Sequence, residues 1–399
     1  MLKKILCAGG LLFWSAIIFA QLTIRVTAVP ANTPPQDTLF VAGTFNNWNP
    51  GSPNFALQAQ ADGSYSIVLQ PPVGRVEFKC TRGNWQRVEG NAQGGARPNR
   101  VLTYQGQAQT VSISILSWED LGGAPAANST AAANVQILAS SFAMPQLNRQ
   151  RRIWLYLPPD YATSNKRYPV LYMHDGQNLF DRSTSFSGEW QVDETLNRLF
   201  AEGDRGVIVV GIDNGGQHRI DEYAPWRNAQ YGGGSGADYV QFIVETLKPY
   251  IDANFRTRPG RDFTGMGGSS MGGLITLYAV LEYPEVFSKA LVFSPAFWFA
   301  EESYTHARTK GKRADTRIYL LAGALEGNGS VVRDAQQMYN TLREAGFSAR
   351  ELTLVTHADG QHSEWYWARE FAAAYQKLFS PDRVRQRVPA RSGVLPRND

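Results

Sequence analysis

A chain of 399 residues, 43% of them hydrophobic, is long enough for two domains with buried cores. Its formal net charge is +4, of which Lys3 and Lys4 contribute +2 and residues 381–399 contribute +3, so that the rest of the chain carries −1. A nearly neutral body excludes the basic surface that binding of nucleic acid requires.

The first 20 residues, MLKKILCAGGLLFWSAIIFA, have the pattern of a secretory signal peptide, with two lysines ahead of an apolar stretch. The uncharged run from Ile5 to Ala20 has 16 residues, fewer than the roughly 20 that a membrane span needs. We therefore expect a cleaved, secreted or periplasmic protein with no membrane association after cleavage. Cleavage would leave Cys80 without a cysteine partner, so no intrachain disulfide is expected.

Residues 21–116 contain short runs of alternating apolar and polar residues, separated by clusters of Pro, Gly and Asn. The runs are LTIRVTAV, DTLFVAGTF, GSYSIVLQ, VEFKCT and AQTVSISIL. Alternation with a period of two is typical of half-buried strands. This pattern predicts a small β-sandwich domain.

Residues 117–136, rich in Ala, Gly, Pro, Ser and Asn, are predicted to form a linker. In residues 137–380, apolar strand candidates alternate with helical stretches such as GADYVQFIVETLKPYIDANF and SEWYWAREFAAAYQKLF. The strand candidates are RRIWLYLP, YPVLYMHD, GVIVVGID, DFTGMGG, ALVFSPA, RIYLLAGA and ARELTLVTH. This alternation predicts an α/β domain with a mostly parallel sheet and helices on both faces. Residues 381–399 are expected to be a disordered basic tail.

The segment FTGMGGSSMGGL joins a predicted strand to a predicted helix and contains the pattern GxSxG. In a strand-turn-helix setting this pattern holds a nucleophilic serine in a strained turn above the sheet edge. Ser270 has glycines at both required positions, Gly268 and Gly272. The alternative register, centred on Ser269, would need a glycine where Met271 stands. We therefore predict an α/β-hydrolase domain with Ser270 as the nucleophile, and a packing or hydrogen-bonding role for Ser269.

A serine hydroxyl needs a base to accept its proton, and in this fold the acid and then the histidine follow the serine in the sequence. Both His357 and His362 follow the last predicted strand. We favour His362 as the base because it lies in the loop after that strand, whereas His357 abuts the strand itself. For the acid we favour Glu326, in the loop after RIYLLAG, over Asp334, which falls inside a helical pattern.

Two backbone N–H groups are needed to hold the oxyanion that forms during acyl transfer. Met271 follows the nucleophile and supplies one of them, and the amide of Gln177, after the strand YPVLYMHD, is our candidate for the other. We expect no metal at His174 and Asp175. Neighbouring residues on a strand point to opposite faces, and no HExxH motif or cysteine cluster accompanies them.

Five blocks of the larger domain resemble the putative esterase (esterase D) family, which includes feruloyl, acetylxylan and enterochelin-type esterases. The blocks are LNRQRRIWLYLPPDY, YPVLYMHDGQNLFD, IDNGGQHRIDEYAPW, GSSMGGL and GQHSEWYW. The resemblance implies a hydrolase that uses Ser270, Glu326 and His362 and no cofactor. Several members of the family carry Asp where this chain has Glu326, and some siderophore-cleaving members have no clear acid.

Substrate contacts are expected near Arg219, Glu222 and Tyr223, which resemble the family's R..EY element and could equally brace their loop through an ion pair. Tryptophans could also frame a pocket for an aromatic acyl group or a sugar, although in α/β domains they often serve packing. Of these we select Trp190 and Trp298 as substrate-binding candidates.

Two tryptophans of the first domain, Trp48 and Trp85, stand in polar turn contexts. The segments GTFNNWNP, EFKCTRGNW and PNRVL resemble starch- and glycogen-binding modules, in which the matching tryptophans stack on α-glucan. The resemblance implies stacking roles for Trp48 and Trp85 and hydrogen-bonding roles for Lys79 and Asn99. Related folds also serve as spacers, so polysaccharide binding and a spacer role both stay open.

These features together predict a secreted serine esterase that cleaves carboxylic acyl esters on carbohydrate, of acetyl or feruloyl type. Two alternatives stay open: a siderophore esterase of the enterochelin type, and a non-catalytic glycan-binding protein with a vestigial hydrolase domain. The predicted triad speaks against the second alternative. The presence of the first domain, which siderophore hydrolysis does not require, speaks against a siderophore esterase.

Overall fold

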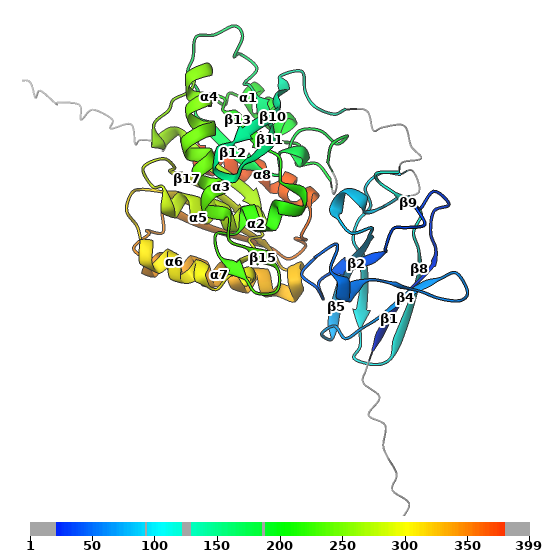
Figure 1. Cartoon of the computed structure of the whole chain (residues 1–399). Coiled ribbons are helices and arrows are strands. Elements are labelled where there is room, and N and C mark those ends of the chain that lie inside the picture. Colours follow the sequence, from blue (N-terminus) through cyan, green and yellow to red (C-terminus); the bar gives the residue numbers. More distant parts are fainter. Residues whose placement is uncertain (1–20, 92–93, 122–128, 186–187, 380–399) are drawn as a thin grey trace, which may run out of the picture. The chain divides into compact units, whose positions relative to one another are not determined.

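The computed structural model describes residues 21–91, 94–121, 129–185 and 188–379. The chain forms two compact units, Met1–Ala124 and Pro125–Asp399 (Figure 1). The predicted signal peptide, the predicted basic tail and the middle of the predicted linker lie outside the described residues. Within the described ranges, no helix combines the length and the apolar character needed to cross a bilayer.

The first unit contains a four-stranded sheet of order β3-β4-β1-β8 and a three-stranded sheet of order β2-β5-β7. The strands are β1 (Leu22–Ala28), β2 (Phe40–Gly43), β3 (Gln58–Ala59), β4 (Tyr65–Leu69), β5 (Gly74–Thr81), β7 (Arg100–Tyr104) and β8 (Gln109–Ser114). Alternate residues of β1, namely Leu22, Ile24 and Val26, are fully buried. They share one apolar cluster with Val41 and Phe78 from the other sheet. All five runs predicted as strands in this unit are strands, and β3 and β7 were not predicted.

Both ends of the predicted linker are structured. Ser117–Trp118 forms β9, which pairs antiparallel with β6 (Glu89–Gly90). Trp118 is 1% exposed, and its Nε1 donates a hydrogen bond to Thr33 Oγ1 at 2.8 Å. At the other end, β10 begins at Val135. The stretch between the two folded units is therefore shorter than the predicted range 117–136.

The second unit is built around an eight-stranded sheet of order β10-β11-β13-β12-β16-β17-β18-β19. The strands are β10 (Val135–Met144), β11 (Arg149–Tyr156), β12 (Val170–His174), β13 (Ile208–Ile212), β16 (Thr264–Ser269), β17 (Lys289–Phe293), β18 (Arg317–Gly323) and β19 (Leu352–His357). The pairings of β11 with β10 and β13 are antiparallel, and the six strands from β13 to β19 are mutually parallel. The prediction of a mostly parallel sheet is confirmed, and all seven predicted strands are present.

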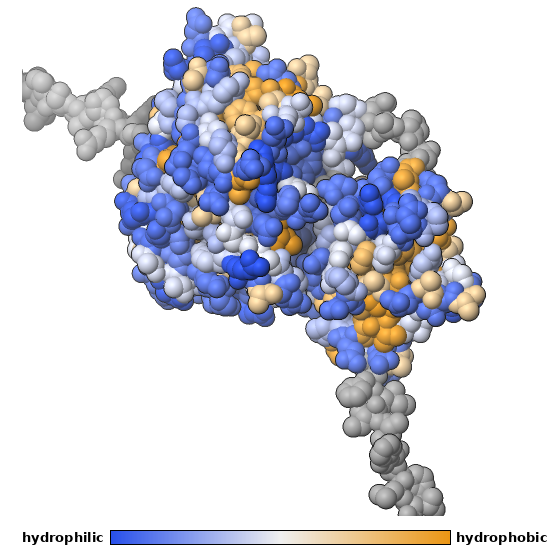
Figure 2. Space-filling model, viewed as in Figure 1, coloured by the Kyte–Doolittle hydropathy of each residue, from blue (hydrophilic) through white to orange (hydrophobic). Residues whose placement is uncertain are grey.

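Helices cover both faces of this sheet (Figure 1). One apolar cluster contains residues of α1 (Val192–Ala201) and α8 (Glu364–Phe379), and a second contains residues of α3 (Gly236–Phe242), α5 (Met271–Glu282) and α7 (Ser330–Glu344). Their apolar sides face the sheet, and Figure 2 shows that the visible face of this unit is mostly hydrophilic.

The helices differ from the predicted ones in detail. The helix predicted over residues 236–255 is divided by a π-helical segment, Ile243–Leu247, which separates α3 from α4 (Lys248–Asn254). Two short helices, α2 (Arg219–Tyr223) and α6 (Glu302–Lys310), were not predicted.

Candidate active site

Ser270 stands at the junction of β16 and α5 with a backbone φ of 58° and ψ of −121°. A positive φ is rare for a residue with a Cβ and costs of order 1–3 kcal/mol, so the surroundings must hold the turn. The Ser270 N–H donates to Phe293 O at 2.9 Å, and the Ala296 N–H donates to Ser270 O at 3.0 Å. Ser269, the last residue of β16, is only 4% exposed, so the half-exposed Ser270 is the more accessible of the two serines.

Close packing against His174 explains the glycines that flank Ser270. A Cβ at Gly268 would lie 2.9 Å from His174 Cδ2, and a Cβ at Gly272 would lie 3.3 Å from His174 Cβ. The first distance is shorter than real Cβ contacts, so a larger residue would displace the imidazole or the turn. His174 is 1% exposed, and its Nδ1 lies 2.9 Å from the hydroxyl oxygen of Tyr239.

His362 and Glu326 are joined by a hydrogen bond of 2.7 Å between Nδ1 and Oε2. His362 lies between β19 and α8, and Glu326 begins the short turn Glu326–Gly329 after β18. The side chain of His362 is 28% exposed, whereas that of Glu326 is fully buried. Because the carboxylate engages Nδ1, the nitrogen left for proton transfer is Nε2.

The second carboxylate oxygen of Glu326 accepts two further hydrogen bonds. Ser294 Oγ and the Gly323 N–H each donate to Oε1 at 2.7 Å. Ser294 Oγ in turn accepts from Trp367 Nε1 at 2.9 Å, and the Trp367 ring stands edge-on to His362 with centroids 5.2 Å apart. Neither Ser294 nor Trp367 was identified from the sequence, although the polar position directly after the apolar run ALVF was a signal for Ser294.

The parallel strands bring these residues to one edge of the sheet, because the carboxyl ends of parallel strands share an edge. Ser270 follows β16, Ser294 follows β17, Glu326 follows β18 and His362 follows β19. These four strands are consecutive neighbours in the sheet, and Gln177 follows β12 on the other side of β16. The sheet order therefore brings the serine, the acid and the histidine to one edge of the sheet.

The two predicted oxyanion donors lie at this same edge. Met271 is the first residue of α5, where N–H groups have no acceptor within the helix. Gln177 belongs to the 3-10 turn Gly176–Asn178, and its side-chain Oε1 accepts a hydrogen bond from the Asn214 N–H at 3.2 Å. This bond anchors the turn that carries the Gln177 amide.

An ion pair braces the loop after β12. Asp175 accepts hydrogen bonds from Arg219 Nε at 2.7 Å and Nη2 at 2.9 Å, and from Asn214 Nδ2 at 2.7 Å. Burial opposes ionisation of Asp175, but Arg219 holds the pKa of this carboxyl below its usual value. Tyr223 is fully buried, and its hydroxyl accepts from the Asp175 N–H at 3.1 Å. The predicted substrate contact of Tyr223 is therefore corrected, because this residue is inaccessible. Arg219 braces its loop through the ion pair, which is the alternative that the sequence left open, and its contact with substrate stays a prediction.

The two tryptophans predicted to bind substrate differ in exposure. Trp190 is 2% exposed and packs against Phe293 and Trp367, with ring centroids 5.4 Å and 5.5 Å away. The prediction is wrong for Trp190, because this residue belongs to the apolar core. Trp298 is 40% exposed and meets Tyr231 edge-on at 5.9 Å, so it remains a candidate.

The rival residues are placed elsewhere. His357 Nδ1 lies 3.2 Å from the Tyr366 hydroxyl. Asp334 lies within α7, and burial raises the pKa of its carboxyl. Among the described residues, the carboxylate that bonds His362 is that of Glu326 and not that of Asp334.

Trp48 and Trp85 of the first unit lie side by side, with ring centroids 6.2 Å apart and planes inclined by 39°. Both are half-exposed. Lys79 is only 4% exposed, and Asn99 Nδ2 donates to Glu77 Oε2 at 3.1 Å. The predicted glycan contact of Lys79 is corrected, because its burial removes it from the surface, whereas the tryptophan pair remains a candidate.

Comparison with known proteins relates the chain to esterases. The profile of the family described as "Putative esterase" matches residues 144–378. The chain is 42% identical to an alpha-amylase of Niallia circulans over 101 residues, which are 25% of this chain and 8% of that protein. It is 25% identical to an endo-1,4-beta-xylanase/feruloyl esterase of Xylanibacter ruminicola over 229 residues, which are 56% of this chain and 29% of that protein. The chain thus spans less than a third of each of these two relatives.

A solved structure shares the fold. The crystal structure of enterochelin esterase from Shigella flexneri matches with a TM-score of 0.52 and 18% identity, over 86% of this chain and 88% of that chain. Together with the family match, this likeness gives the second unit an α/β-hydrolase-like fold.

The buried His174 predicts a dependence of stability on pH. Burial lowers the pKa of His174 from 6.5 to about 3, so the folded protein keeps this imidazole neutral. The unfolded chain takes up a proton below pH 6.5, so the contribution of His174 to the free energy of unfolding is complete above pH 6.5 and is lost as the pH falls toward 3. Between pH 7 and pH 5 the loss is about 2 kcal/mol.

Urea unfolding of wild type and His174→Gln at these two pH values measures the effect. From pH 7 to pH 5, the free energy of unfolding of the wild type is expected to fall by about 2 kcal/mol more than that of the variant. The variant has no imidazole at this position to protonate. An equal loss in both proteins would contradict a neutral buried His174.

Proposed function

Because the chain belongs to the putative esterase family and is a carboxylic ester hydrolase, we propose that Ser270 is its nucleophile, His362 its general base and Glu326 the acid that orients the base. The observation that carries this proposal is the 2.7 Å hydrogen bond between His362 and the buried Glu326, at the sheet edge that also carries the Ser270 turn. A buried carboxylate on Nδ1–H holds the imidazole in the tautomer that can accept a proton at Nε2, and it stabilises the imidazolium.

The reaction follows from these positions. Ser270 Oγ attacks the ester carbonyl carbon while its proton passes to His362 Nε2. The tetrahedral intermediate collapses as the imidazolium gives that proton to the departing alcohol, which leaves an acyl group on Ser270. A water molecule, activated by the same imidazole, then attacks the acyl carbon and releases the acid.

The oxyanion of each tetrahedral intermediate needs donors that are already in place. We assign this role to the backbone N–H groups of Met271 and Gln177. Met271 opens the 12-residue helix α5, so the partial positive charge of the helix N-terminus adds to its hydrogen bond. Gln177 is held in its turn by the bond from Asn214 to its side chain.

The substrate that we propose is an acyl ester on carbohydrate, of acetyl or feruloyl type. The xylanase/feruloyl esterase relative supports this class. Trp298 lies in the short helix Phe297–Phe299, which follows β17 at the carboxyl edge of the sheet, and with Tyr231 it offers aromatic faces to an acyl or sugar ring.

For the first unit we propose a β-sandwich that binds polysaccharide of the α-glucan type. The adjacent, half-exposed indoles of Trp48 and Trp85 support this role, since the apolar face of a sugar ring packs on an indole. The identity with an alpha-amylase over 101 residues points the same way. We also propose that residues 1–20 direct the chain to the periplasm or the exterior, where polysaccharide is accessible.

Replacement of the nucleophile tests the triad. Ser270→Ala is expected to lower kcat for a short p-nitrophenyl ester by about 10⁴-fold or more, because it removes the attacking oxygen. Ser269→Ala is the matched control and should retain activity within about tenfold, since Ser269 is buried in β16. Full activity in Ser270→Ala would contradict the assignment.

A substrate panel tests the acyl and alcohol groups. Purified protein should hydrolyse acetylated or feruloylated sugars with a kcat/KM at least about tenfold above that for an enterochelin-type ester, because the proposed substrate is an ester on carbohydrate. The reverse preference would assign the protein to siderophore hydrolysis while leaving the triad intact.

Retention on insoluble starch tests the first unit. Trp48→Ala and Trp85→Ala are each expected to weaken binding by about tenfold or more, because each removes one of the two adjacent indoles on which a sugar ring would pack. Trp365→Ala, which removes an exposed tryptophan of the second unit, is the control and should bind as wild type does. If wild type fails to bind starch or any other polysaccharide, the first unit is a spacer.

A further inference from the structure

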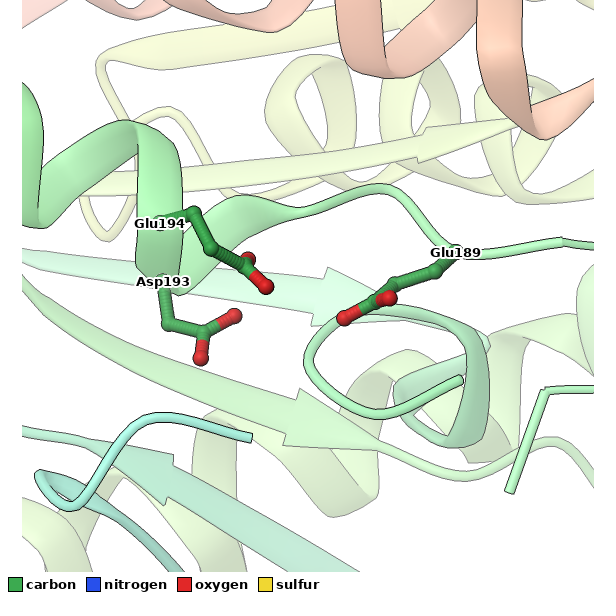
Figure 3. A group of neighbouring side chains, drawn as sticks. All are labelled: Glu189, Asp193 and Glu194. Atoms are coloured by element: carbon green, nitrogen blue, oxygen red, sulfur yellow. The ribbon is translucent and has the colours of Figure 1, made fainter. Parts of the chain in front are cut away.

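Three carboxylates gather where the chain enters α1 (Figure 3). Ligand oxygens of Glu189, Asp193 and Glu194 all lie within 4.8 Å of one another. Asp193 and Glu194 come from the first turn of α1, whereas Glu189 comes from the loop before it, and Figure 3 shows the three side chains pointing toward one another. Their exposure is graded: Asp193 is buried, Glu189 is half-buried and Glu194 is exposed. The cluster therefore reaches from the interior to solvent.

Asp193 carries an oxygen that the protein does not satisfy. Its side chain is fully buried, and Oδ2 accepts a hydrogen bond from the Ala132 N–H at 2.7 Å. Oδ1 is buried and has no hydrogen-bond partner within the part of the chain that the structure describes. A buried charged oxygen without a partner costs free energy, so it calls for a proton or a cation beside it.

The charges around the cluster do not supply that cation. Two other groups act on Glu189 across space: Asp181, which is also acidic, and Arg182. Arg182 forms no ion pair with any of the three carboxylates among the described residues. Thr130 Oγ1 donates to both oxygens of Glu189 at 3.0 Å, which orients this carboxylate but adds no positive charge.

We propose that Glu189, Asp193 and Glu194 bind a Ca²⁺ ion. Hard divalent cations prefer oxygen ligands, and Ca²⁺ takes 6–8 of them at 2.3–2.6 Å, so two oxygens on one ion can lie up to about 5.2 Å apart. The separations here fall within that limit. The set contains no sulfur or imidazole nitrogen, which are the ligands typical of Zn²⁺ sites. Water completes the shell on the side of the exposed Glu194.

Acidic residues also stabilise a helix N-terminus without any metal. That role accounts for Asp193 and Glu194, which lie in the first turn of the 10-residue helix α1. It does not account for Glu189, which lies outside the helix, or for the unsatisfied Oδ1 of Asp193. A proton shared between Asp193 and Glu194 would satisfy Oδ1 but would leave Glu189 outside the bond, whereas a shared cation accounts for all three residues.

The ion would fasten a segment that lies under the active site. Trp190, next to Glu189, packs on Trp367, whose indole bonds Ser294, which in turn bonds Glu326. The same ion would hold Ala132 and Thr130, near the start of the second unit, through their bonds to Asp193 and Glu189. We therefore expect Ca²⁺ mainly to raise the stability of the fold. Through the contacts of Trp190, it should also order the residues around Glu326. The inference rests on these contacts and not on the proposed triad.

Calorimetric titration of the EDTA-treated full chain with Ca²⁺ tests the site. One Ca²⁺ per chain is expected to bind and to raise Tm, and Glu189→Gln is expected to weaken binding by about tenfold or more because it removes a charged ligand. Glu202→Gln, which removes an exposed carboxylate at the other end of α1, is the matched control and should bind within about twofold of wild type. Tb³⁺ luminescence excited through the neighbouring Trp190 gives a second readout, and Glu189→Gln should lower it while Glu202→Gln should not.

Several results would overturn the proposal. If the wild type shows neither heat nor a change in Tm with Ca²⁺, the acids serve the helix N-terminus, and Asp193 shares a proton with Glu194 in place of a cation. Unchanged Ca²⁺ binding in Glu189→Gln would place any ion elsewhere, and tighter binding of Mg²⁺ than of Ca²⁺ would contradict the choice of ion. Asp193→Asn adds the buried ligand to the test. If that variant does not fold, the half-buried Glu189 decides the outcome.

Discussion

Burial of the Glu326 carboxylate removes a charged group from water, which costs free energy. Three hydrogen-bond donors from three different segments of the second unit offset this cost. Gly323 N–H and Ser294 Oγ bond one oxygen, and His362 Nδ1 bonds the other. A buried carboxylate that lost one of these donors would keep its charge with fewer hydrogen bonds to stabilise it, which is destabilising. The same bonds that satisfy the carboxylate therefore fix the orientation of the imidazole, so stability and the proposed role of His362 as general base depend on one network.

The sheet order makes this network possible. Parallel strands β16 to β19 are neighbours, and each delivers one polar residue to the shared carboxyl edge. Beneath that edge, Trp190, Trp367 and Phe293 form a packed aromatic layer that carries the indole donor to Ser294. The apolar core thus positions the polar site directly, and the strained φ of Ser270 is held by bonds to the same β17 region.

Local patterns predicted the parts of this structure that depend on local geometry. Glycine spacing distinguished Ser270 from Ser269, and strand and loop positions led to Glu326 and His362. Contacts between distant segments were not predictable in this way: the bond from Trp367 to Ser294 depends on how α8 packs on β17. The errors at Trp190 and Tyr223 have the same origin, since a tryptophan or tyrosine near a loop can face either the core or a ligand, and only tertiary packing decides.

The central claim is that Glu326 holds the proton-bearing Nδ1 of His362, and proton NMR in water measures this bond directly. The wild type should show a low-field, slowly exchanging resonance of the imidazole Nδ1–H. In Glu326→Gln that resonance should vanish, and kcat should fall by about 10²-fold or more. In Asp334→Asn the resonance should remain and kcat should equal that of the wild type. A resonance and a kcat that survive in Glu326→Gln would contradict the account.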